Sequence, residues 1–124
     1  MTDRTAEIVI TGAARTPMGA FQGELAPLAA PDLGGAAIAG AIGNAGVDAA
    51  VVDEVIMGQV LTGGAGQNPA RQASIHSGVP KEKPAFIVNQ VCGSGIRSIA
   101  SGFQSIKSGD SKIVIAGGQE SMSL

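Results

Sequence analysis

Aromatic side chains are nearly absent from this sequence. Three Phe are its only aromatic residues, 2% of 124 positions, and it contains neither Trp nor Tyr. A core must therefore be built from aliphatic residues and Met, which dominate the 44% hydrophobic content. Nineteen glycines allow backbone segments to approach one another closely. This composition favours tightly layered α/β packing in one domain, or in part of one.

Cysteine and histidine each occur only once, as Cys92 and His76. A single cysteine excludes an internal disulfide, and one histidine without a pair of cysteines leaves no zinc-binding constellation. We therefore expect no metal site and a reducing compartment.

Charge and long apolar runs are also scarce. Charged residues make up 15% of the chain, the net charge is −2, and Lys and Arg form no basic stripe, so nucleic acid is not an expected partner. No run approaches the ~20 apolar residues of a membrane span. The first residues carry charges where a signal peptide needs an apolar run. We expect a cytoplasmic protein that binds neither nucleic acid nor membranes.

Short β-branched runs alternate with helical patterns along the chain. Helices between strands imply a parallel or mixed, mostly parallel, sheet with covering helices, which is an α/β fold. The runs that predict strands are each bounded by Gly, Pro or Asp and lie at residues 7–11, 52–58, 86–91 and 112–118.

Start and stop signals place two of the helices. Asp32 is predicted to cap a helix that ends at Gly46. Asn68 is predicted to cap a second helix, with Pro69 at its first position and Gly78 past its end.

A third helix is predicted directly after Cys92, so that residues 86–116 form a strand–helix–strand unit. Cys92 then lies in a Gly-rich turn between the strand and the helix. The helix is indicated by apolar residues at i, i+3, i+4 and i+7 spacing that end at Gly109: Ile96, Ile99, Ala100, Phe103 and Ile106.

The residues alone leave more than one interpretation of Cys92. A helix N-terminus favours a thiolate, and Gly93 and Gly95 would let a ligand carbonyl reach backbone N–H donors, as at a nucleophile with an oxyanion hole. Free cysteines are also common as small buried hydrophobes. A dinucleotide-binding fingerprint is disfavoured, because Ser98 stands at its third glycine and no acidic residue follows at the required place.

Other candidate residues carry weaker signals. His76 could be the base of a Cys–His pair, but its helical context favours a surface or packing role. The Gly-rich loop at 61–69 precedes a helix as an anion-binding loop does, yet it lacks the GK[ST] of a P-loop, which favours a structural loop or an interface. Arg71 and Arg97 are expected to make ion pairs rather than bind a substrate.

Four segments resemble the thiolase family, most of all its biosynthetic acetyl-CoA acetyltransferases. In chain order they are GAARTPMGAFQG, VIMGQVLTGGAGQNPARQ, VNQVCGSGIRSIASG and IVIAGGQESMS, and they extend over almost the whole sequence. The resemblance implies half of a five-layered αβαβα fold, with residues 1–124 forming an incomplete N-terminal domain.

The resemblance also implies a function for Cys92. It would be the nucleophile at the N-terminus of a buried helix, with its backbone N–H in an oxyanion hole. The complete enzyme would condense two acetyl-CoA to acetoacetyl-CoA through an acyl-cysteine, or run the thiolytic reverse. Coenzyme A thioesters would be substrates, no separate cofactor is implied, and the assembly would be a homodimer or homotetramer. The residues that hold coenzyme A are not identified.

The sequence departs from the family in what it lacks. Thiolases carry a catalytic His in a GHP motif and a second Cys in a CxGGG motif of their C-terminal half, and neither motif occurs here. Few elements are predicted to cover the second face of the sheet. We therefore expect an N-terminal fragment that is inactive alone. The alternative is a non-catalytic half-fold module that acts in dimerisation or binding.

Overall fold

Three parallel strands form the centre of the fold. The computed structural model describes residues 6–124, and β1 lies between the other two strands in the order β2-β1-β3. The predicted α/β class is confirmed, and the sheet is parallel throughout. In chain order the elements are α1 (Ala30–Ala45), the short 3₁₀ helix η1 (Ala49–Val51), β1 (Glu54–Gly58), α2 (Pro69–His76), β2 (Ala85–Val88), α3 (Ser94–Ser108) and β3 (Val114–Gly118).

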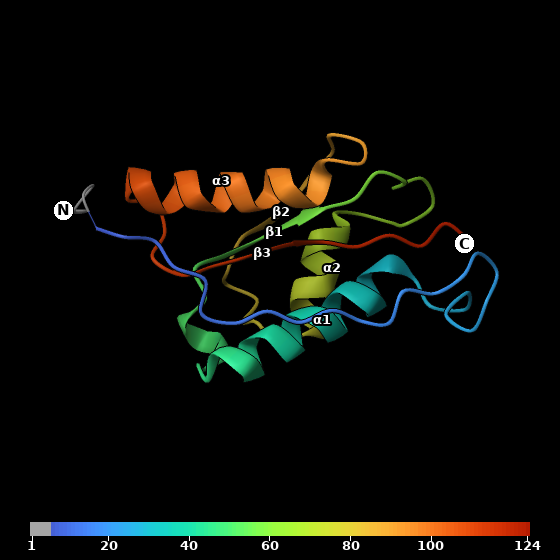
Figure 1. Ribbon diagram of the computed structural model, residues 1–124, viewed down its shortest axis with the longest axis horizontal. Coiled ribbons are helices and arrows are strands. Elements are labelled where there is room, and N and C mark those ends of the chain that lie inside the picture. Colours follow the sequence, from blue (N-terminus) through green and yellow to red (C-terminus); the bar gives the residue numbers. More distant parts are fainter. Residues whose placement is uncertain (1–5) are drawn as a thin grey trace.

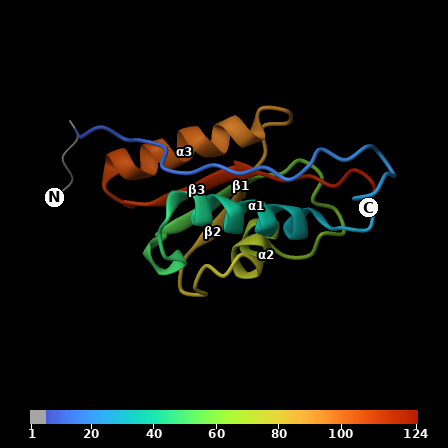
Figure 2. The same ribbon diagram turned by 60° about the horizontal axis from the view of Figure 1, so that its bottom comes forward.

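Helices cover both faces of the sheet. Figures 1 and 2 show α3 on one face, with α1 and α2 together on the other. The expectation of a poorly covered second face is therefore wrong. A parallel sheet normally buries both of its faces. Here α1 and α2 together cover the face that was expected to lack helices. Within residues 6–124, no helix combines the length and apolar character needed to cross a membrane.

The hydrophobic core lies between the sheet and the α1–α2 layer. Val55 and Met57 of β1 belong to it. Ile56 between them is also fully buried, and it points to the α3 side because successive side chains of a strand alternate between faces. The other buried members of the core are Ile38, Val52, Ala70, Ala73 and Val79, so the core is aliphatic as the composition predicts.

The helix ends follow the predicted signals, with one shift. Asn68 caps α2 by accepting a hydrogen bond from the Arg71 N–H at 3.1 Å, and Gly46 ends α1 in a left-handed conformation (φ 68°). Asp32 is not the cap of α1, which begins two residues earlier. Its carboxylate instead accepts the Ala29 N–H at 3.1 Å from within the first turn.

The strand predicted at residues 7–11 is wrong. This segment pairs with no strand among the described residues, and the Val9 and Ile10 side chains are 64% and 80% exposed. The chain contacts α1 only after this segment: a Cβ at Gly12 would lie 2.6 Å from the Ala41 carbonyl oxygen, and Asn44 donates to the Ala13 carbonyl. Figure 1 shows the chain continuing along α1 from there. A β-branched run favours extended backbone, but the segment becomes a strand only if a neighbouring strand has an unpaired edge to bind it.

The apolar stripe predicted on α3 marks a helix but faces away from the sheet. Ile96 is 77% exposed and Phe103 is 50% exposed, whereas the buried side of α3 carries small residues such as Ser98 and Gly102. A Cβ at Gly102 would lie 3.1 Å from Cγ1 of Val114. Small residues are used on this side because the helix lies so close to β3. The outer side of α3 is therefore exposed in this chain.

Asp53 ties the start of β3 to the start of β1 and yields a pH-dependent prediction. Its carboxylate accepts the Lys112 and Ile113 N–H groups at 2.7 and 3.0 Å, and these hydrogen bonds lower the pKa of Asp53. A lowered pKa in the folded state contributes stability above the unfolded value of about 3.9, and that stability is lost as the pH falls through the folded value.

We expect Asp53→Asn to lower the free energy of unfolding by up to about 1 kcal/mol at pH 7, because two hydrogen bonds to an ionised acceptor are replaced by weaker bonds to a neutral amide oxygen. The difference from wild type should shrink below pH 4, because the wild-type carboxyl becomes protonated there. Urea unfolding at several pH values measures both. Glu82→Gln is the control, since Glu82 is exposed and makes no hydrogen bond to the described residues. A deficit for Asp53→Asn that persists unchanged at pH 3 would contradict the prediction.

Candidate active site

Cys92 lies in a tight turn between β2 and α3. The turn is closed by the Gly93 N–H, which donates to the Gln90 carbonyl at 3.1 Å, and the first helical residue is Ser94. The predicted strand–turn–helix setting is confirmed. The Cys92 side chain is exposed, so it is not the small buried hydrophobe that was the alternative interpretation.

The residue before Cys92 is held in an unfavourable backbone conformation. Val91 has φ 51°, in the left-handed region that β-branched residues rarely adopt and that costs about 1–3 kcal/mol. Asn89 Oδ1 accepts the Val91 N–H at 3.0 Å. The Ser94 hydroxyl, which is 4% exposed, accepts the Gln90 N–H and donates to the Val91 carbonyl. These hydrogen bonds fix the backbone of the turn that carries Cys92.

Two glycines at the ends of neighbouring strands allow the first turn of α3 to pack directly against the sheet. Gly58 of β1 and Gly118 of β3 are paired in the sheet. A Cβ at Gly58 would lie 2.5 Å from the carbonyl carbon of Ser94, and one at Gly118 would lie 3.4 Å from the Cα of Gly95. Gly95 itself has no neighbour within 4 Å on its Cβ side, so the backbone beside Cys92 is open to a ligand.

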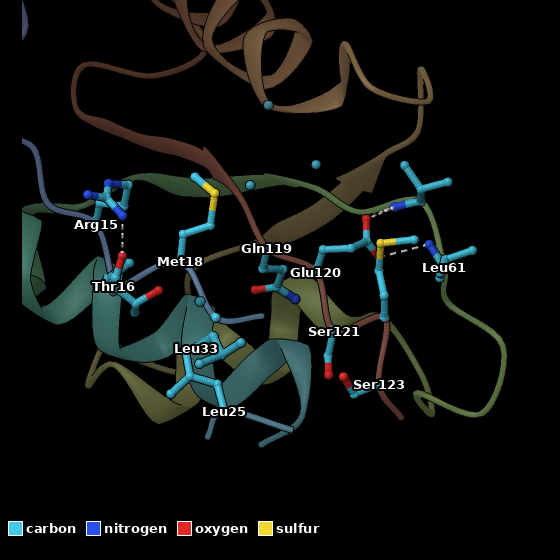
Figure 3. Close-up of a pocket in the computed structure, with 18 of the residues that line it drawn as sticks. Arg15, Thr16, Met18, Leu25, Leu33, Leu61, Gln119, Glu120, Ser121 and Ser123 are labelled. Atoms are coloured by element: carbon cyan, nitrogen blue, oxygen red, sulfur yellow. Dashed lines mark hydrogen bonds between the residues drawn. The ribbon is translucent and has the colours of Figure 1, made fainter. Parts of the chain in front are cut away.

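Cys92 borders a cavity of about 800 Å³. Its walls come from the loop at residues 14–21, from α1, and from the segments that follow β1, β2 and β3 (Figure 3). The only ionisable side chains among its described lining residues are Arg15, Cys92 and Glu120. Most of the remaining side chains are apolar, among them Met18, Phe21, Leu25, Leu33, Leu61, Val91 and Met122.

A buried pair of glutamines, which sequence reasoning missed, adjoins this cavity, and Gln119 is one of the lining residues. Gln119 Nε2 donates to Gln59 Oε1 at 2.8 Å and to the Pro69 carbonyl at 3.2 Å, and Gln59 Nε2 donates to the Leu61 carbonyl at 2.9 Å. Gln119 Oε1 is buried against Gly34 of α1, where any Cβ would overlap it. The sequence carried only part of the signal: a Gly-Gln pair occurs at 58–59 and again at 118–119, but the register that brings the two pairs together is set by the sheet.

Glu120 follows Gln119 and was also missed as a site residue. Its carboxylate accepts the Val60 N–H at 2.9 Å and the Leu61 N–H at 3.0 Å, and Figure 3 shows it reaching the Leu61 backbone. It thereby joins the segment after β3 to the segment after β1. Both carboxylate oxygens are engaged by backbone donors.

The weaker candidates do not join Cys92 in a catalytic arrangement. His76 Nδ1 lies 3.4 Å from the Asp32 carboxylate, both side chains are about half exposed, and neither lines the Cys92 cavity. Arg71 binds the Lys81 and Lys83 carbonyls, so its partners are carbonyls rather than the expected carboxylates. No group of three or more His, Cys, Asp or Glu within residues 6–124 is placed to hold a metal ion.

Arg97 and the Gly-rich loop have structural partners. Arg97 Nε donates to the Gln90 side-chain carbonyl at 2.6 Å, which supports the Cys92 turn in place of the expected ion pair. In the loop at 61–69, Gln72 Nε2 donates to the Ala65 and Gln67 carbonyls at 2.7 and 2.9 Å. The loop is thus held by the helix it precedes, which agrees with the structural interpretation.

Comparison with known proteins adds a family context. A family model described as "Thiolase, N-terminal domain" matches residues 8–124. The chain is similar to an acetyl-CoA acetyltransferase of Pseudomonas aeruginosa, 53% identical over 118 residues that cover 95% of this chain and 30% of that protein. It is 55% identical to an acetyl-CoA acetyltransferase of Rhizobium meliloti over 117 residues, 94% of this chain and 30% of the relative. The chain thus spans about 30% of the length of these curated relatives.

The left-handed conformation of Val91 leads to a stability prediction. We expect Val91→Asn to raise the free energy of unfolding by about 1 kcal/mol, because Asn tolerates this conformation and the Val side chain is already 64% exposed. Val51→Asn is the control: Val51 is 43% exposed and does not have a positive φ, so it should show no gain. Urea unfolding of both variants measures the difference. Equal losses of stability in both would contradict the prediction.

Proposed function

Because the chain belongs to the thiolase family, we propose that Cys92 is the residue that accepts an acyl group from a coenzyme A thioester. The complete enzyme then acts as an acetyl-CoA acetyltransferase, which condenses two acetyl-CoA or cleaves acetoacetyl-CoA with coenzyme A. The observation that carries the proposal is an exposed thiol, in a strained and hydrogen-bonded turn at the N-terminus of α3, that borders a largely apolar cavity.

The acyl transfer follows ordinary nucleophilic chemistry. The Cys92 thiolate attacks the thioester carbonyl carbon, and the carbonyl oxygen becomes an oxyanion that backbone donors such as the Cys92 N–H stabilise. The bond to the coenzyme A sulfur then breaks, coenzyme A leaves as a thiolate that takes up a proton, and acetyl-Cys92 remains. The open backbone at Gly95 leaves room for the thioester next to the thiol.

The second half-reaction needs a base that residues 6–124 do not place in the cavity. A second acetyl-CoA must lose a proton from its α-carbon, and the carbanion must attack acetyl-Cys92 and release the Cys92 thiolate. Arg15 is cationic, and both oxygens of Glu120 accept backbone N–H groups. In the proposed complete enzyme, which we expect to be a cytoplasmic homodimer or homotetramer, further residues supply the base.

A non-catalytic role remains the second candidate, because one observation favours it. The outer face of α3 exposes Ile96, Ile99 and Phe103, each by 48% or more. Contiguous exposed apolar side chains of this kind mark surfaces that contact other proteins. A binding or dimerisation module would use this face and would not need the Cys92 thiol.

Acyl transfer to Cys92 can be tested on the 124-residue chain. We expect acetyl-CoA to acetylate Cys92 faster in the folded chain than in the same chain unfolded in urea, because the turn orients the thiol toward open backbone donors. Mass mapping of peptides locates and quantifies the acetyl group. Cys92→Ser should fold with a free energy of unfolding within about 0.5 kcal/mol of wild type, since the side chain is exposed, and should carry no acetyl group there. A label on another residue, or equal rates in both states, would refute the proposal and leave the binding module.

Turnover gives a separate prediction. The isolated chain should not degrade acetoacetyl-CoA in the presence of coenzyme A beyond one equivalent of acyl-enzyme. The described residues that line its cavity include no free base, and its one histidine lies elsewhere. The reaction is measured as the loss of acetoacetyl-CoA absorbance over time. Multiple turnovers by chain of verified mass, with a Cys92→Ser control that is inactive, would show that the base is present after all.

A further inference from the structure

We propose that Glu120 is a positioning residue for Cys92, which it reaches through a continuous series of hydrogen bonds across all three strand ends. The inference rests on the proposed function only in taking Cys92 as the reactive group. Glu120 itself need not touch a substrate. The series runs from the Glu120 carboxylate through the backbone at Val60 and Leu61, and then through the Asn89 side chain to the N–H of Val91.

The first link is the pair of bonds from the segment after β1 to the Glu120 carboxylate. The Val60 and Leu61 N–H groups donate to separate oxygens at 2.9 and 3.0 Å. Hydrogen bonds to an ionised acceptor are roughly twice as strong as neutral ones. A carboxylate bonded to two successive N–H groups therefore fixes both the position and the orientation of this segment.

The second link passes through one peptide group. The peptide between Val60 and Leu61 donates its N–H to Glu120 and accepts the Asn89 Nδ2–H on its carbonyl at 3.3 Å. Polarisation at one end of a peptide strengthens the bond at the other. The carboxylate thus supports the bond that holds the Asn89 side chain, which follows β2.

The third link reaches the residue next to the nucleophile. With Nδ2 of Asn89 donating to Val60, its Oδ1 accepts the Val91 N–H at 3.0 Å. This assignment of the amide is the only one that satisfies both contacts, because the Val60 carbonyl needs a donor and the Val91 N–H needs an acceptor. Val91 is the left-handed residue that precedes Cys92, and it holds this conformation only because surrounding bonds impose it.

Loss of the charge at Glu120 should therefore change the position of the Cys92 thiol. With Glu120→Gln, one side-chain oxygen is replaced by an NH₂ group that faces a backbone N–H, so the segment after β1 must shift. Asn89 then loses the acceptor that orients its amide, and Val91 can relax. The thiol leaves its alignment with the N-terminus of α3.

The test uses alkylation of Cys92 by iodoacetamide in the folded 124-residue chain, followed over a range of pH. We expect Glu120→Gln to lower the rate at neutral pH about two- to fivefold, the range that a helix N-terminus contributes to a nearby charge. Asn89→Ala should lower it similarly, and the double variant should fall no further, because both act through one series of bonds. Asn89→Ala also provides the test if Glu120→Gln does not fold.

Asp53→Asn is the matched control. Asp53 is also a carboxylate that accepts two successive backbone N–H groups, but at the opposite end of β3. It should lower stability and leave the alkylation rate of Cys92 unchanged. A wild-type rate in Glu120→Gln, additive effects in the double variant, or an equal fall in Asp53→Asn would overturn the proposal. Alkylation needs no coenzyme A thioester, so failure of acetylation alone would overturn the proposed function and not this inference.

Discussion

The backbone contact between the first turn of α3 and the paired glycines Gly58 and Gly118 is the constraint on which the rest of the site depends. No side chain fits at Gly58, where a Cβ would lie 2.5 Å from the Ser94 backbone. The helix can therefore rest directly on the ends of β1 and β3, and the Cys92 turn stands at the edge of the sheet. The same pairing places Gln59 and Gln119, which follow the two glycines, side by side. The register of β1 and β3 therefore produces both the buried glutamine pair and the packing surface for α3.

Parallel strands bring the segments that follow them to a single edge, and this determines what the site contains. Backbone groups in such segments need partners, which neighbouring side chains supply here. Glu120 is occupied in this way, so the described residues give the cavity beside Cys92 a thiol and mostly apolar walls but no free base. His76 is paired with Asp32 and does not line the cavity. Within residues 6–124, Cys92 therefore lies in the cavity without a neighbouring His or a free carboxylate.

Local signals explain which elements were predicted correctly. Strand runs bounded by turn residues predicted β1, β2 and β3 to within a few residues, and the caps at Asn68 and Gly109 placed helix ends. The same logic failed at residues 7–11, because a β-branched run cannot show whether a strand edge is free. It also did not show which side of α3 faces the sheet. The side with small residues does so, and the apolar stripe faces away, because the helix lies so close to β3.

The sequence by itself determined the α/β class and the strand–turn–helix around Cys92, because these depend on residue types at short spacing. Its four motifs carried the family resemblance. The tertiary structure alone decided that Val91 is left-handed and that Glu120 and Asn89 meet on one peptide group. The contact of Asn89 with Val60 spans 29 positions of the chain, and that of Glu120 with Leu61 spans 59. They exist only once the register of the parallel strands is set, and no local pattern encodes that register.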